Sequence, residues 1–154
     1  MQIVSAEFKE RGIEVEYEWK PEWCKSVRAL PFDCYFSNLA LSTTSATRTL
    51  ENIVLEVDGM QHFFPLPGHD FEKQLRHDLY KMKCLKKHDI PLIRLLSRTI
   101  VESKSTWFAR LEKACDILIK TRTRKAILLE DNKCYRDWHD KYFDDSLRPY
   151  VLWF

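Results

Sequence analysis

The chain has 154 residues, of which 45% are hydrophobic and 13% aromatic, and this is enough for one domain with a sizeable core. These proportions exclude a disordered or fibrous protein, and 25 basic against 23 acidic residues neither require nor exclude a polyanionic partner. The sequence predicts no membrane span, because no stretch approaches the roughly 18 apolar residues that a span needs. Five cysteines without a CxxC pair, and no basic and apolar leader, favour an intracellular protein of the cytoplasm, nucleus or nucleoid that is not secreted.

The order of elements follows from hydrophobic periodicity and turn residues. The predicted elements are a helix at 3–11, strands at 13–19 and 29–36, a Ser/Thr-rich loop at 37–52, a strand at 53–58, a helix at 71–87, a strand at 91–96, a helix at 106–121, a strand at 126–129, a helix at 135–143 and an apolar segment at 150–154. This order predicts a mixed α/β (α+β) fold in which helices flank a central mixed β-sheet. We expect a single domain over residues 1–154, with a motif-bearing core at about 12–96 and an extension at about 104–154.

Two acids interrupt the most apolar of the predicted strands, at residues 53–58. Because side chains alternate along a strand, Glu56 and Asp58 project from the same face. If the strand at 29–36 pairs with this strand as a hairpin, Asp33 lies across from Glu56 and completes a three-carboxylate cluster. Such a cluster repels itself unless a cation binds it, and oxygen ligands favour Mg²⁺ or Mn²⁺ over zinc.

A metal held in this way supports phosphoryl transfer, because it activates a bound water and neutralises charge on a phosphodiester. His62 follows the two acids closely and could deprotonate the water or protonate the leaving group. Simpler interpretations stay open for each residue. Asp33 could form a turn, His62 could be a structural histidine, and Asp78 of the helix at 71–87 could pair with Arg94 of the next strand.

Four segments occur in a recognisable order: LPFDCYF, IVLEVDGMQHFF, RHDLYKMK and IPLIRL. Together they resemble the PD-(D/E)xK nuclease superfamily, and specifically the branch near very-short-patch repair endonucleases and related phage homing endonucleases. The resemblance covers about residues 12–96. It implies a restriction-endonuclease-like fold and a Mg²⁺- or Mn²⁺-dependent endonuclease, with DNA favoured over RNA as the substrate.

The same resemblance implies a metal site. Asp33 resembles the first metal-binding aspartate, and Glu56 resembles the acidic residue of the second half-motif. The carbonyl of Val57 would be a further ligand. Relatives commonly carry a Gly-Glu pair on an earlier helix, which this chain lacks, so the resemblance leaves open whether one or two metals bind.

The remaining catalytic positions also come from the resemblance. Asp58, Gln61 and His62 stand where this branch replaces the usual catalytic lysine, and His62 is the strongest candidate for proton transfer. Asp78 resembles the helix aspartate that completes the site. Lys81 would contact phosphate.

Partners are predicted from charge. Basic residues on the helix at 71–87 form an outer surface that could track phosphates: Lys73, Arg76, His77, Lys83 and Lys87. A homodimer is the simplest way to cut both strands of a duplex. Two alternatives stay open: a nuclease that cuts RNA or branched DNA with the same residues, and an inactive nuclease-fold module that binds nucleic acid or a protein partner.

Overall fold

The computed structural model describes residues 1–42 and 47–154. Its centre is a six-stranded sheet in the order β1-β2-β3-β4-β5-β6. The strands are β1 (Glu16–Trp19), β2 (Phe32–Ser42), β3 (Thr47–Asp58), β4 (Leu92–Leu96), β5 (Ile127–Leu129) and β6 (Val151–Trp153). The helices are α1 (Gln2–Glu10), α2 (Phe71–Lys87), α3 (Ser97–Glu102), α4 (Trp107–Thr121) and α5 (Lys133–Tyr142), with 3₁₀ turns η1 (Met60–His62) and η2 (Arg148–Tyr150).

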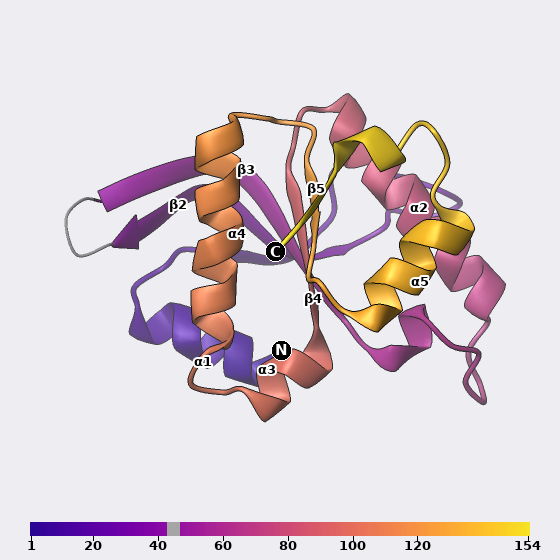
Figure 1. The fold of residues 1–154 in the computed structure, drawn as a ribbon, viewed down its shortest axis with the longest axis horizontal. Coiled ribbons are helices and arrows are strands. Elements are labelled where there is room, and N and C mark those ends of the chain that lie inside the picture. Colours follow the sequence, from indigo (N-terminus) through magenta and orange to yellow (C-terminus); the bar gives the residue numbers. More distant parts are fainter. Residues whose placement is uncertain (43–46) are drawn as a thin grey trace.

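The sheet is mixed and is covered on both faces. Strands β1, β2 and β3 pair antiparallel, whereas β3, β4, β5 and β6 pair parallel. One hydrophobic core lies between the sheet and α1, α3 and α4, and a second lies between the sheet and α2 and α5 (Figure 1). The predicted mixed α/β fold with flanking helices is therefore confirmed.

The predicted loop at 37–52 is wrong on both sides of residues 43–46, which lie outside the described residues. Strand β2 continues to Ser42, and β3 begins at Thr47, so the two strands form a long hairpin that extends beyond the helices in Figure 1. Leu39 and Leu41 are buried under the core that α4 covers. These leucines alternate with the exposed residues Asn38 and Ala40, and this period of two is the strand signal that the Ser/Thr-rich composition concealed.

Other differences lie at the ends of elements. Helix α2 begins and ends as predicted, and its first turn is capped by the side chain of Asp70, which accepts a hydrogen bond from the backbone N–H of Lys73 (3.0 Å). Strand β1 is shorter than predicted and mostly exposed, because it is the edge of the sheet. Helix α3 was missed, since a single buried residue, Ile100, gives it no periodicity. Within residues 1–42 and 47–154, no helix combines the length and the apolar character required to cross a membrane.

The topology brings three strand ends together at one end of the sheet, which is called its edge below: the start of β2 and the ends of β3 and β4. Parallel pairing places the carboxyl ends of β3 and β4 side by side, and antiparallel pairing brings the start of β2 to the same edge. Helix α2 packs over this edge on the face that α5 also covers. On α2, Gln74, Asp78 and Lys81 share one side because they are spaced by four and three residues.

Candidate active site

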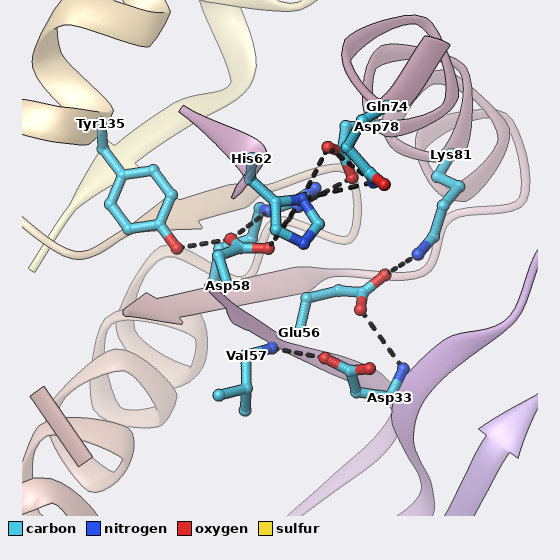
Figure 2. Close-up of polar contacts among 10 residues, drawn as sticks. Asp33, Glu56, Val57, Asp58, His62, Gln74, Asp78, Lys81 and Tyr135 are labelled. Atoms are coloured by element: carbon cyan, nitrogen blue, oxygen red, sulfur yellow. Dashed lines mark hydrogen bonds and ion pairs between the residues drawn. The ribbon is translucent and has the colours of Figure 1, made fainter. Parts of the chain in front are cut away.

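Asp33 and Glu56 meet where β2 begins and β3 ends. The register pairs Cys34 with Leu55, so Asp33 lies opposite Glu56, as the hairpin prediction requires. The backbone N–H of Asp33 donates to Glu56 Oε2 (3.3 Å), and the backbone N–H of Val57 donates to Asp33 Oδ2 (2.7 Å) (Figure 2). Two carboxylates are therefore held next to each other by backbone groups of neighbouring strands.

Glu56 is buried and has a cation as its partner. Its side chain is only 4% exposed, and Lys81 Nζ from α2 forms an ion pair with Oε1. From the described residues, Oε1 accepts no hydrogen bond. Burial raises the pKa of Glu56 to about 8, against the opposing effect of the Lys81 ammonium. The Lys81 ammonium also lies 4.7 Å from the centre of the Phe32 ring.

Asp58 projects from the same face of β3 but has different partners. Arg94 of β4 binds it with two nitrogens, Nε to Oδ2 (2.7 Å) and Nη2 to Oδ1 (2.6 Å). The Tyr135 hydroxyl of α5 donates a further hydrogen bond to Oδ2 (2.5 Å). Asp58, Arg94 and Tyr135 are all at most 1% exposed. Both oxygens of Asp58 are thus committed to donors inside the protein.

Asp78 joins this pair to His62. Arg94 Nη2 donates to Asp78 Oδ1 (3.0 Å), which confirms the predicted pair between the helix and the strand. Oδ2 of Asp78 is 2.8 Å from His62 Nδ1 and accepts from Gln74 Nε2 (3.2 Å). Burial tends to raise the pKa of Asp78, but the charges of Arg94 and His62 outweigh it and hold that pKa well below its usual range.

The imidazole of His62 lies between two carboxylates. Its Nδ1 is 2.8 Å from Asp78 and 3.6 Å from Asp58. Burial tends to lower the pKa of His62, but the hydrogen bond to Asp78 and the charges of both aspartates outweigh it, so the net shift is upward. This arrangement favours an imidazolium that can release a proton from its other nitrogen.

The three-carboxylate cluster predicted from the sequence is not formed. Asp33 and Glu56 come together, but Asp58 faces Arg94 and Tyr135 instead. In the described part of the chain, no three His, Cys, Asp or Glu side chains lie close enough to hold a metal ion between them.

No known protein family, curated protein sequence or solved structure gives a match to this chain. The resemblance to PD-(D/E)xK nucleases therefore stays a prediction, and the function must be argued from the site itself.

The donor set of the site suits a hard divalent cation. Asp33 and Glu56 offer carboxylate oxygens, which Mg²⁺ and Mn²⁺ prefer. Glu56 Oε1 already faces a positive charge, that of Lys81, and accepts no hydrogen bond from the described residues. Val57, the third predicted ligand, contributes its N–H to Asp33, which orients that carboxylate.

Gln61 takes no part in this network. The Gln61 amide lies against Gly59 and occupies the space that a Cβ atom would fill at that position. The absence of a side chain at Gly59 therefore makes room for Gln61. The backbone of Gly59 is extended (φ −78°, ψ 170°) and needs no left-handed conformation. The prediction that Gln61 stands beside the acids therefore gains no geometric support.

The predicted nucleic-acid surface divides into two parts. It comprises the α2 residues Lys73, Arg76, His77, Lys83 and Lys87, none of which is buried. Lys83 pairs with Asp144 (2.7 Å) near the end of α5. His77 lies one turn before Lys81 and about 40° around the helix axis, and Lys73 lies two turns before it and about 80° around, so His77 flanks the site and Lys73 lies at its outer margin.

Two residues of the site were missed by sequence analysis. Gln74 carries a usable signal, because it lies one turn before Asp78 and two turns before Lys81 on the same side of a helix. Tyr135 carries no such signal, since it lies 77 residues from Asp58, its partner in space. A further buried acid, Glu130, accepts hydrogen bonds from Leu96 N (3.0 Å) and Thr99 Oγ1 (2.8 Å) and anchors α3 to the sheet.

Proposed function

We propose that the chain is a metal-dependent endonuclease that hydrolyses phosphodiester bonds. The observation that carries this proposal is the pairing of Asp33 with a buried Glu56 and Lys81, beside a histidine that two carboxylates polarise. A carboxylate pair, an ammonium and an acid–base histidine are groups that can together catalyse phosphodiester hydrolysis. The preference for DNA over RNA rests on the resemblance alone.

In the proposed mechanism, Asp33 and Glu56 would hold one Mg²⁺ or Mn²⁺. When bound, the metal would lower the pKa of a water and neutralise charge on the phosphate. Lys81 contacts a non-bridging phosphate oxygen with its ammonium. His62 holds a proton on the ring nitrogen that faces away from Asp78 and gives it to the leaving oxygen, because the hydrogen bond to Asp78 and the charges of both aspartates outweigh burial, raise the pKa of the imidazole and favour its protonated form.

Cleavage assays with the Glu56→Gln variant test this proposal. The substrates are labelled single-stranded, duplex and branched DNA and RNA, each with Mg²⁺ or Mn²⁺. We expect Glu56→Gln to lower the rate more than about 100-fold, since substitutions of groups that only support metal ligands already cost 10–100-fold. The matched control is Glu51→Gln, which removes the same charge from an exposed position of β3. Equal rates for the native protein and Glu56→Gln would contradict the assignment.

One observation favours the inactive binding module as the second candidate. Lys81, Arg94 and His62 already pair with Glu56, Asp58 and Asp78, so the buried acids are compatible with a folded chain without metal. Binding of nucleic acid without cleavage, equal in the native protein and Glu56→Gln, would support this candidate.

The side of α2 that carries Lys81 should govern affinity for nucleic acid. We expect Lys73→Glu to weaken DNA binding and to reduce the slope of log K against log salt by about one, because one phosphate contact is lost. The matched control is Lys83→Glu, on the side of α2 that faces Asp144. Fluorescence anisotropy over a range of salt concentrations measures both effects. A larger loss for Lys83→Glu than for Lys73→Glu would place the interface on the other side of the helix.

A further inference from the structure

The position of Lys81 is unusual for a lysine. Its side chain is 9% exposed, and its ammonium lies against Glu56 and over the Phe32 ring. Lysine is rarely buried unless it is paired, because the ammonium loses its hydration. In its ionised form, Glu56 is thus the anion that keeps Lys81 inside the protein, and Lys81 is the cation paired with it.

The partners of Glu56 differ from those of the other buried acids. Asp58 and Asp78 accept hydrogen bonds or ion pairs on all four of their oxygens, from rings, guanidinium, amide and hydroxyl groups. Glu56 accepts one backbone hydrogen bond on Oε2, and its Oε1 faces Lys81 alone among the described residues. A lysine stem has four rotatable carbons, whereas Arg94 is fixed by two carboxylates. Exchange of the bound cation is therefore easiest at Glu56.

We propose that Lys81 and a divalent cation exclude each other at Glu56, and that the ammonium displaced by the metal binds a phosphodiester of the nucleic acid. This inference rests on the proposed function for the identity of both ligands. Two cations on one oxygen would repel each other, so the metal must displace the ammonium. The displaced ammonium needs a new anion, because an unpaired buried charge is costly.

Displacement of this kind couples the two ligands. A phosphodiester that binds the ammonium removes the competitor from Glu56 and so raises the affinity for metal. By thermodynamic linkage, the metal raises the affinity for nucleic acid by the same factor. Lys81 thereby keeps the site closed to metal until a substrate phosphate is present.

Calorimetric titration of the full chain with Mn²⁺ at fixed pH tests this coupling. Each protein is titrated alone and with a short phosphorothioate DNA strand, which keeps the charge of DNA but resists cleavage. We expect the native protein to bind one Mn²⁺ about 5–150-fold more tightly with DNA, the usual range for coupled sites. Lys81→Met, which keeps the length and packing of the side chain, should bind Mn²⁺ about 10-fold or more tightly than the native protein without DNA and gain nothing from DNA.

Two further variants complete the experiment. Lys113→Met removes an exposed lysine from α4, on the opposite face of the sheet, and should leave Mn²⁺ affinity unchanged with and without DNA. Lys81→Arg keeps the charge, and its guanidinium can bind Glu56 with two nitrogens, so Mn²⁺ should bind more weakly than to the native protein. If Lys81→Met does not fold by circular dichroism, Lys81→Arg provides the test.

The outcomes separate this inference from the proposed function. Mn²⁺ binding that depends on Glu56 but is unchanged or weaker in Lys81→Met, or unchanged in Lys81→Arg, would overturn the exclusion and leave the metal site intact. No Mn²⁺ binding to any of the proteins, with or without DNA, would overturn the proposed metal-dependent nuclease together with the exclusion.

Discussion

An Arg94→Met variant is expected to lose about 3–5 kcal/mol of unfolding free energy, the cost of removing one partner from a buried ion pair. Arg94 is fully buried and is the guanidinium that both Asp58 and Asp78 bind. Without it, two carboxylates remain in a core that also contains Trp138, whose ring lies 4.9 Å from the guanidinium. Methionine fills much of the volume of the Arg94 side chain. The loss of unfolding free energy is therefore caused more by the unpaired carboxylates than by a cavity.

Urea unfolding measures this loss. The control is Arg98→Met, because Arg98 is 68% exposed and its pair with Glu102 is surrounded by solvent, where ion pairs contribute little to stability. The difference in unfolding free energy between the native protein and Arg94→Met should become smaller as the pH is lowered. The pKa of Asp78 is lowered in the native protein, so the stability it contributes is lost as pH falls below about 4, the ordinary pKa of aspartate. In Arg94→Met, the buried Asp78 has no guanidinium beside it, so burial raises its pKa. Protonation of Asp78 at low pH therefore stabilises the folded variant. A loss below about 1 kcal/mol at neutral pH would mean that the acids do not depend on Arg94.

The fold was predictable wherever local patterns agree with tertiary packing. The residues of α2 follow the helical period, and the acids of β3 follow the alternation of a strand, so the helix and the position of Asp33 opposite Glu56 could both be anticipated. The extension of the β2–β3 hairpin through residues 37–42 and 47–52 was missed because Ser and Thr residues surround its buried leucines. Composition suggested a loop, whereas the spacing of Leu39 and Leu41 carried the correct signal.

The site was predictable as a set of residues but not as a set of partners. The sequence places Glu56 and Asp58 on one face, yet it does not show that β4 brings Arg94 to one acid and α2 brings Lys81 to the other. Each of these contacts depends on the position of a strand or helix that is distant in sequence. Asp58 was therefore grouped with the predicted metal ligands, and the contribution of Tyr135 from α5 could not be foreseen.

His62→Ala is expected to lower the cleavage rate about 10²–10⁴-fold, the range for loss of a general acid or base. His62 is the titratable group whose Nδ1 is held by Asp78 and whose second ring nitrogen is left for the substrate. The control is His69→Ala, which removes an exposed histidine from the following loop. Single-turnover cleavage in Mn²⁺ isolates the chemical step from product release.

A second substrate decides which proton His62 moves. When sulfur replaces the leaving bridging oxygen, the departing thiolate needs no proton, so a general acid becomes dispensable. His62→Ala should then cut the sulfur substrate at nearly the native rate, while Glu56→Gln should stay slow on both substrates. The native rate on ordinary DNA should fall as pH rises through the raised pKa of His62, and Asp78→Asn should move that fall to lower pH because it removes the hydrogen bond that raises the pKa. If His62→Ala slows cleavage of both substrates equally, His62 acts on the attacking water and not on the leaving group. The assignment of His62 as the general acid would then be wrong, and its raised pKa would work against its role as a base.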